Sequence, residues 1–171
     1  MSLSPDEYYR VIAKTQLVSS DLYCVYEDKL LLGKRLNSPA KNWLFTPGSR
    51  AFKNELLEQT CIRVAKEELG VDIKFSDCKM IGVFDHQYTD NFRDSKFGTH
   101  YVNVAYVCEF SPKQRESVRR DDQHSYFEWI PTKDVLHHRN IHPIVKHSFR
   151  RAVEMKLIPG FTTTLSGKSE E

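Results

Sequence analysis

The sequence lacks the features that mark several large classes of protein. Its longest apolar runs, such as residues 30–32, are far shorter than the ~20 residues that a helix needs to cross a bilayer. Lys and Arg number 25 against 23 Asp and Glu, and the net charge of +2 indicates no surface for bulk electrostatic binding. The first ten residues are polar. We therefore expect no membrane span, no signal peptide and no nucleic-acid partner.

Cysteine is scarce and carries no metal-binding spacing. The four cysteines stand among apolar neighbours without a Cys-x-x-Cys pair, at Cys24, Cys61, Cys78 and Cys108. This usage is typical of reduced thiols in the core of a cytoplasmic protein, and it argues against a zinc finger. With 171 residues, 40% of them hydrophobic, the chain can bury a core without disulfides or a structural metal. We expect one domain over residues 1–161 and a disordered polar tail over 162–171.

Local patterns predict helices and strands in alternation. Ser4 is the expected cap of a first helix, with Glu7 completing the capping pattern. A second helix is expected between a cap at Asn54 and a stop at Gly70. The other expected elements are a hairpin over 17–26 and 29–35, strands over 43–46, 73–84, 101–110 and 126–130, and a helix over 143–156. This order indicates an α/β fold, a mixed β-sheet between helices, with a polar loop over 86–100.

One segment carries a chemical pattern on the second expected helix. It combines acidic, basic and glycine positions at fixed spacing, namely Glu55, Arg63, Glu67, Glu68 and Gly70. The segment resembles the Nudix box, whose family has an α/β/α fold, with a mixed sheet sandwiched between helices. The resemblance implies that a backbone carbonyl and helix carboxylates meet one divalent cation beside a diphosphate.

Two positions depart from the box. Ser49 replaces a glycine, which predicts a relaxed loop if that glycine has a positive φ. Val64 replaces a glutamate. Because positions 64, 67 and 68 share one helix face by spacing, one of three clustered carboxylates is exchanged for an apolar side chain. We expect fewer bound cations and a general base other than a metal-activated group.

Across most of its length the chain resembles the GDP-mannose mannosyl hydrolases, a branch of the Nudix superfamily. The resemblance rests on residues 17–21, 31–40, 90–92 with 99–102, and 122–124 before Trp129. It implies hydrolysis of GDP-mannose, and often GDP-glucose, to GDP and free sugar by inverting substitution at the anomeric carbon. It also implies one Mg²⁺ per site, with Mn²⁺ as an alternative ion, and a homodimer.

The resemblance assigns roles residue by residue. The Mg²⁺ ligands it implies are the carbonyl of Gly48, the carboxylate of Glu68 and the side-chain oxygen of Gln123. His124 matches the general base, and an imidazole with a pKa near 6.5 suits that task. The other catalytic positions are Asp21, Arg35, Arg50, Arg63 and Tyr101, of which the arginines and Tyr101 would stabilise the leaving GDP. Weaker candidates for substrate contact are Tyr8, His86 and Tyr88; the remaining histidines 137, 138, 142 and 147 are expected on the surface.

Several alternatives stay open at this point. Arg63 can instead form a helix ion pair with Glu67. The apolar stripe of the first helix, which includes Tyr8, can pack across a two-fold axis or on the protein's own sheet. A pyrophosphatase that attacks phosphorus is a second activity, which Val64 disfavours. A catalytically silent nucleotide-binding module is a third, disfavoured because the chain retains both a base and a leaving-group clamp.

Overall fold

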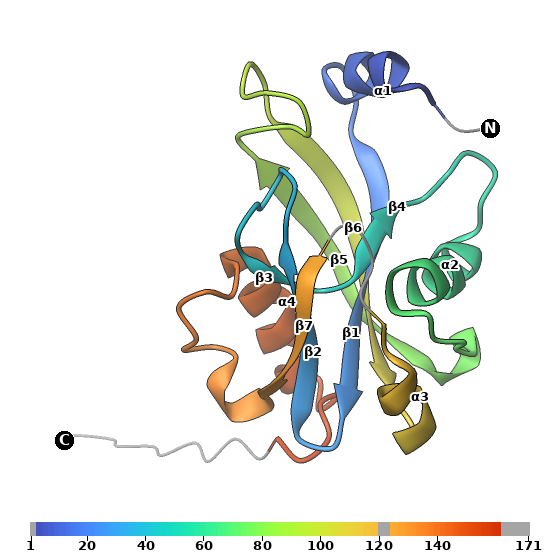
Figure 1. Ribbon diagram of the computed structural model, residues 1–171, viewed down its shortest axis with the longest axis vertical. Coiled ribbons are helices and arrows are strands. Elements are labelled where there is room, and N and C mark those ends of the chain that lie inside the picture. Colours follow the sequence, from blue (N-terminus) through green and yellow to red (C-terminus); the bar gives the residue numbers. More distant parts are fainter. Residues whose placement is uncertain (1–2, 120–123, 162–171) are drawn as a thin grey trace.

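A mixed seven-stranded sheet with helices on both sides forms the described part of the chain, which in this computed structural model is residues 3–119 and 124–161 (Figure 1). The strands are β1 Leu17–Tyr26, β2 Lys29–Arg35, β3 Leu44–Phe45, β4 Gly48–Arg50, β5 Cys78–Tyr88, β6 Thr99–Glu109 and β7 His124–Pro131. The helices are α1 Pro5–Ile12, α2 Leu57–Leu69, α3 Pro112–Ser117 and α4 Pro143–Glu154, with 3₁₀ turns at Phe75–Asp77 and Thr132–Asp134. None of these described helices combines the length and apolar character that a bilayer span requires.

The strand order confirms the predicted α/β architecture. Strands run β3-β2-β1-β6-β5, with β4 paired to β1 and β7 paired to β2. β1 and β6 are parallel, while the other pairs are antiparallel. A parallel pair needs a long crossover, and the chain between β1 and β6 contains both α2 and the edge strand β5.

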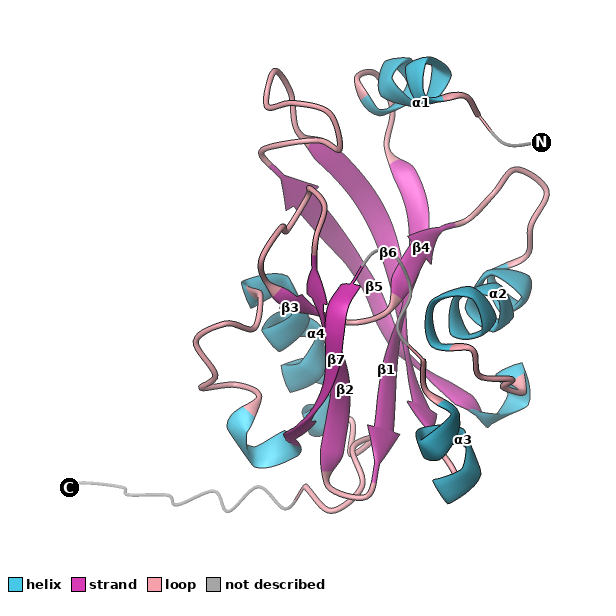
Figure 2. Ribbon diagram, in the orientation of Figure 1, coloured by secondary structure: helices cyan, strands magenta, loops and turns pink. Residues whose placement is uncertain are grey.

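Helices lie on both sides of the sheet (Figure 2), and an apolar layer covers each of its faces. Successive side chains of a strand point to opposite faces. In β1, Leu22 and Cys24 therefore pack toward α2, whereas Tyr23 and Val25 pack toward α4. All four side chains are fully buried, which explains why residues 22–25 form a continuous apolar run and not an alternating pattern.

The β1–β2 hairpin opens away from its turn. The two strands pair directly at Val25 with Leu30 and at Tyr26 with Lys29. Farther from the turn, β4 pairs with β1 over residues 19–21 and β3 pairs with β2 over residues 33–34. The separated ends of β1 and β2 therefore place polar residues on the two sides of one opening.

The helix ends agree with the local signals in part. Ser4 caps α1 with the predicted capping box, and Gly70 ends α2 in the left-handed conformation at φ 70°. The predicted cap at Asn54 is wrong, because α2 begins after Leu56 and Asn54 itself has a left-handed φ of 68°. The side chain of Gln59 instead accepts a hydrogen bond from the Leu56 N–H at 2.8 Å.

The predicted loop over residues 86–100 is too long. β5 continues to Tyr88, so that His86 pairs with Tyr101 and Tyr88 pairs with Thr99 across an antiparallel ladder. Polar side chains hid this strand, because a strand beside a polar cavity does not show the apolar alternation of a core strand. The charged stretch after residue 110 also contains a short helix, α3, capped by Ser111.

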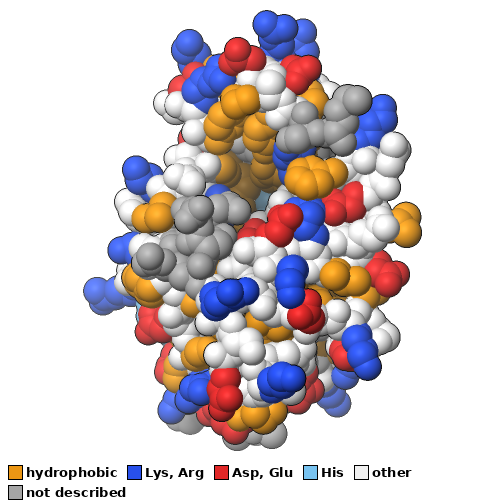
Figure 3. Space-filling view, turned by 45° about the vertical axis from the view of Figure 1, so that its right-hand side comes forward, with side chains coloured by type: hydrophobic (Ala, Val, Ile, Leu, Met, Phe, Trp, Pro, Cys, Tyr) orange, Lys and Arg blue, Asp and Glu red, His pale blue; other side chains and the backbone are white. Residues whose placement is uncertain are grey.

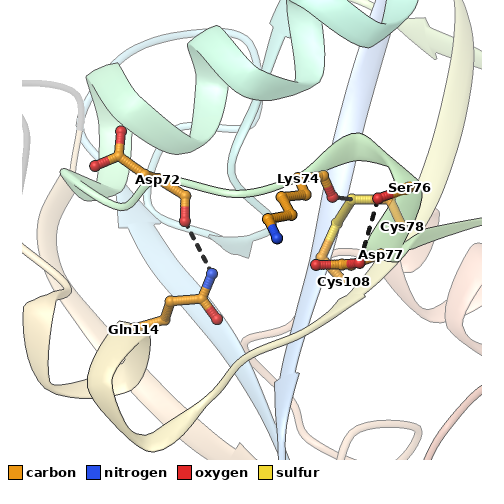
Figure 4. The surroundings of a disulfide bond; sticks show 7 residues. All are labelled: Asp72, Lys74, Ser76, Asp77, Cys78, Cys108 and Gln114. Atoms are coloured by element: carbon orange, nitrogen blue, oxygen red, sulfur yellow. Dashed lines mark hydrogen bonds between the residues drawn. A yellow bond between two sulfur atoms is a disulfide. The ribbon is translucent and has the colours of Figure 1, made fainter.

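The prediction of four reduced thiols is wrong for one pair. Cys78 and Cys108 lie directly opposite each other on β5 and β6 and form a disulfide (Figure 4). Their Cα atoms are 4.6 Å apart, the separation of a non-hydrogen-bonded antiparallel pair. Cys24 and Cys61 are free and buried. Spacing along the chain could not reveal the pair, since the two residues are 30 positions apart.

Candidate active site

A cavity of about 280 Å³ lies between the splayed strands, the helix α1 and the loop after β5. The space-filling view shows a hollow in the upper half of one face, with hydrophobic side chains around it and charged side chains nearby (Figure 3). Eight of the residues predicted for the site line the cavity, namely Tyr8, Asp21, Arg35, Gly48, Arg50, His86, Tyr88 and Tyr101. Residues from six elements therefore meet at one place, although they are dispersed over most of the sequence.

The predicted residues outside this lining have different reasons for their absence. Arg63 and Glu68 lie on α2 and do not line the cavity. Gln123 falls outside the described residues. His124 is placed only by its backbone, which begins β7 and pairs with Arg35 of β2.

Asp21 and His86 form a buried polar pair at the base of the cavity. They are 5% and 3% exposed, and Oδ2 of Asp21 lies 3.9 Å from Nδ1 of His86. Burial raises the pKa of Asp21 to about 7, against the opposing effects of Asn103, Arg35 and Thr46. Burial lowers the pKa of His86 to about 4, so its imidazole is neutral at pH 7. The pair is therefore a carboxyl group beside a neutral imidazole, not an ion pair.

His142 extends this polar pair behind the cavity wall. The prediction that it is a surface residue is wrong, since the ring is half-buried against Phe45 and Tyr88 and caps α4. Its Nδ1 accepts a hydrogen bond from the Ile144 N–H at 3.2 Å. Burial lowers its pKa, and its positive form would further disfavour a proton on His86.

Gly48 lies between two buried carboxylates. Its N–H donates a hydrogen bond to Oε2 of Glu68 at 3.1 Å, and Glu68 is only 4% exposed. A Cβ atom at this position would collide with the carboxylate of Asp21. Glycine is required here by close approach, not by a positive φ. The next residue, Ser49, lies in β4 and pairs with Ser20. Its φ is not positive, so the replacement of the box glycine by Ser49 requires no relaxed loop.

Arg50 and Arg35 supply the positive charge at the cavity. The guanidinium of Arg50 lies between two aromatic rings, 4.6 Å from the centroid of Tyr8 and 4.9 Å from that of Phe52. Arg35 donates from Nε to the carbonyl of Pro39 at 2.9 Å. Such contacts hold a guanidinium in place before an anion arrives, which reduces the ordering cost of binding.

Arg63 holds the box segment together instead of facing the cavity. Its Nε donates to Oε1 of Glu55 at 2.7 Å, and its Nη2 donates to the carbonyl of Arg50 at 2.9 Å. Nη1 lies 3.3 Å from Oε2 of Glu67, so the alternative ion pair between Arg63 and Glu67 on the helix is also present. Arg63 thus fixes the backbone of β4, and its effect on Arg50 is indirect.

Sequence reasoning missed two cavity residues and one buried polar residue beside Asp21. Phe45 and Thr46 line the cavity, and the hydroxyl of Thr46 donates to Asp21 at 3.4 Å. Asn103 is fully buried on β6, where it contacts Asp21 and donates to the hydroxyl of Ser19 at 2.8 Å. The sequence held no signal for Asn103, because a polar residue is ordinary at the positions between the apolar ones of an alternating strand.

Comparison with known proteins identifies the family. The model of the NUDIX domain matches residues 16–152, which is most of the chain. The chain belongs to the NUDIX domain family. A protein of Haloferax volcanii, named low-salt glycan biosynthesis protein Agl8, is 35% identical over 133 residues that cover 77% of this chain and 82% of that protein.

Solved Nudix structures share the fold at low sequence identity. The MutT protein from Methanosarcina mazei Go1 superposes with a TM-score of 0.68 at 14% identity, covering 85% of this chain and 99% of that one. A MutT NUDIX hydrolase from Burkholderia pseudomallei gives a TM-score of 0.66 at 21% identity, covering 81% and 98%. At these identities the likeness establishes the Nudix fold alone. The match to the NUDIX domain model over residues 16–152 identifies the protein as a Nudix hydrolase.

The two box carboxylates of helix α2, those of Glu67 and Glu68, differ in their exposure to solvent. Val64 is fully buried in the apolar layer with Cys61 and Ala65. Glu68 is buried one turn later, whereas the side chain of Glu67 is 62% exposed. The expectation that residues 64, 67 and 68 present one face is therefore wrong for Glu67. In this Nudix protein one box carboxylate of α2, that of Glu68, lies beside the cavity backbone at Gly48.

The donors near Gly48 fit a hard divalent cation. The buried carboxylate of Glu68 contacts the backbone of Gly48 through its N–H, and Mg²⁺ prefers carboxylate and carbonyl oxygens. Among the side chains of residues 3–119 and 125–161, no three His, Cys, Asp or Glu gather as a metal site. The predicted set is compatible with that finding, since it uses one carboxylate, one carbonyl and one amide. The site therefore suits a cation completed by substrate oxygens and water.

Glu55→Gln is expected to lower the unfolding free energy by roughly 1–3 kcal/mol at pH 6. Hydrogen bonds from Arg63, Phe52 and Thr60 hold the pKa of Glu55 at about 2, below its ordinary 4.5. Because the unfolded chain binds the proton first, this stabilisation is complete above pH 4.5 and is lost as the pH falls toward 2. Urea unfolding between pH 6 and pH 2.5 measures it.

A matched control is the exposed pair of Lys66 and Asp72. Asp72→Asn is expected to change the unfolding free energy by less than about 0.5 kcal/mol, since both side chains are solvated. Equal losses in the two variants would contradict the assigned role of Glu55. The same would follow if the Glu55→Gln protein kept the full acid dependence of the wild type.

Proposed function

We propose that this Nudix hydrolase cleaves GDP-mannose, and GDP-glucose as a second substrate, to GDP and free sugar by substitution at the anomeric carbon. Position 64 gives the strongest support for attack at carbon. A fully buried valine replaces a box carboxylate there, so the groups that would assemble several cations for attack on phosphorus are reduced. The name of the Haloferax volcanii relative, which refers to glycan biosynthesis, is compatible with a nucleotide-sugar substrate.

The charge distribution of the cavity supports the same reaction. When the bond between the sugar carbon and the phosphate oxygen breaks, its electron pair stays on the leaving diphosphate. Arg35 and Arg50 offer two guanidinium groups to that charge, and Tyr101 offers a hydroxyl. Fixed donors of this type stabilise a transition state more than a ground state, because they require no reorganisation as the charge develops.

Asp21 and His86 suit the sugar side of the reaction. The anomeric carbon gains positive character as the bond breaks, and a nearby positive charge favours the ionised form of Asp21, whose pKa is about 7. The neutral imidazole of His86 has a buried Nε2 without a hydrogen-bond partner among the described residues. Because His86 lines the cavity beside Asp21, we assign its side chain to the sugar side of the substrate.

The remaining roles follow the family resemblance. A water oxygen bonds to the anomeric carbon on the face opposite the leaving group, and His124 accepts the water proton. Gly48, Glu68 and Gln123 are the proposed ligands of Mg²⁺, which supplies positive charge for the diphosphate. The position of His124 at the start of β7, paired with the cavity residue Arg35, is compatible with its role. A homodimer remains a prediction.

Hydrolysis in oxygen-18 water tests which bond breaks. We expect label in the anomeric hydroxyl of the released sugar, unlabelled GDP, and first the anomer inverted from the α-linked substrate. Mass spectrometry of both products and an early proton NMR spectrum measure these outcomes. Release of GMP with a sugar phosphate would instead establish a pyrophosphatase, and label in GDP would establish attack on the β-phosphorus; either result would contradict attack at carbon.

A further inference from the structure

Two tyrosine hydroxyls meet at the edge of the cavity. The hydroxyl oxygens of Tyr8 on α1 and Tyr101 on β6 are 2.7 Å apart, although the residues are 93 positions apart in the sequence. Both side chains line the cavity and are partly buried. Tyr101 lies deeper, and burial together with the neighbouring Tyr8 raises its pKa, so it remains a protonated donor at neutral pH. The two hydroxyls share one hydrogen bond, and either can be its donor.

We infer that Tyr8 is a positioning residue, whose hydroxyl donates to Tyr101 and so directs the Tyr101 proton toward the leaving diphosphate. This inference rests on the function proposed above. A hydroxyl has one proton and two acceptor sites. If Tyr101 donates its proton in the hydrogen bond to Tyr8, it has no proton left to donate to a phosphate oxygen. When Tyr8 donates, the two hydrogen bonds point the same way and strengthen each other as negative charge grows on the leaving group.

The surroundings of Tyr8 hold its ring in the required position. Arg50 lies 4.6 Å above the ring centroid, and the ring of Phe92 stacks at 5.2 Å. The helix itself is tied to the loop after β5 by Tyr9, whose hydroxyl donates to Asp94 at 2.7 Å. Because Tyr8 also packs on Arg50, removal of its hydroxyl alone is the informative change. Removal of the whole ring would disturb the charge clamp as well.

A double-mutant cycle of Tyr8→Phe and Tyr101→Phe tests the inference through kcat and KM for GDP-mannose. We expect Tyr8→Phe to lower kcat by about 3- to 10-fold, with KM within two-fold of the wild type, because the interaction strengthens in the transition state. Tyr101→Phe is expected to lower kcat by about 100-fold. In the Tyr101→Phe background, Tyr8→Phe should have no further effect, since its only proposed action is through Tyr101.

Tyr9→Phe is the matched control on the same helix. It removes a hydroxyl that anchors α1 but does not line the cavity. We expect a lower Tm with kcat within two-fold of the wild type. An equal loss of kcat in Tyr9→Phe and Tyr8→Phe would reduce Tyr8 to an anchor of α1. Unchanged kcat in Tyr8→Phe, or the same loss with and without Tyr101, would also overturn the inference.

Calorimetric titration with GDP separates this inference from the proposed function. We expect Tyr8→Phe to weaken GDP binding about 2- to 5-fold when Tyr101 is present and not at all when it is phenylalanine. If the wild type releases no sugar but this coupling in GDP binding persists, the proposed reaction fails and the tyrosine pair stands. If sugar is released but the effects of Tyr8→Phe and Tyr101→Phe are additive both in kcat and in GDP binding, the reaction stands and the inference fails. Absence of GDP binding would overturn both.

Discussion

His124→Ala is expected to lower kcat for GDP-mannose by roughly 10²- to 10⁴-fold at pH 7.5, the effect of removing a general base. The proposed carbon-directed reaction needs one group to accept the water proton. Burial lowers the pKa of His86 to about 4, which makes its imidazole a weak base. Asp21 has the proposed role of stabilising the sugar cation. His124 begins β7 directly opposite Arg35, a cavity residue.

The pH dependence of kcat reports on Asp21. Burial raises the pKa of Asp21 to about 7, and its proposed role needs the ionised form, so kcat of the wild type should fall as the pH drops below 7. His124→Ala should keep this dependence, so the size of the loss in kcat at pH 7.5 is the test of the base. His137→Ala, which removes an exposed histidine outside the cavity lining, is the control and should retain wild-type kcat. Near-full turnover by His124→Ala would exclude His124 as the base.

Val64→Glu, which restores the carboxylate of the Nudix box, is expected to destabilise the protein by about 3–5 kcal/mol. The valine is fully buried among apolar side chains of the layer between α2 and the sheet. A glutamate there would lose its water and would face the like charge of Glu68, one helical turn away. For a chain of this length the loss corresponds to a decrease of roughly 6–20 °C in Tm, measurable by thermal unfolding.

Ile62→Glu is the control for this prediction. Ile62 lies on the same helix but is 38% exposed, so a carboxylate there remains hydrated, and we expect a change below about 0.5 kcal/mol. Addition of Mg²⁺ should recover part of the Tm lost by Val64→Glu, because a cation held near Glu68 would neutralise the added charge. A Val64→Glu protein as stable as the wild type would contradict the assignment of position 64 to the apolar layer.

Local signals predicted much of the fold. The capping box at Ser4, the left-handed stop at Gly70 and the hairpin over residues 17–35 depend on residues within a few positions of each other, and all three are present. The spacing of the Nudix box depends on a single helix and its flanking loops, and the family match confirms the Nudix domain that this spacing predicted. Such features are readable because the interacting groups are also neighbours in the chain.

The site required contacts that no local pattern contains. His86 lies beside Asp21 because β5 continues past the predicted boundary and pairs with β6, which in turn pairs with β1. The direction of Arg63 was undecided by spacing, since a helix position alone does not choose between Glu55, Glu67 and the cavity. Its shortest hydrogen bond, to Glu55, formed because the loop after β4 returns that carboxylate to α2.

The amino-acid order thus specified which chemical groups this Nudix protein possesses, namely the box glutamates Glu67 and Glu68, an apolar residue at position 64 and a set of arginines, tyrosines and histidines. Strand pairing over long separations decided which of them share a cavity. The packing of the helices against the sheet brought Tyr8 to Tyr101 and directed Arg63 to Glu55 and the Arg50 carbonyl. The physical reason is that burial and the register of paired strands depend on the whole sheet, whereas helix caps and turns depend on adjacent residues.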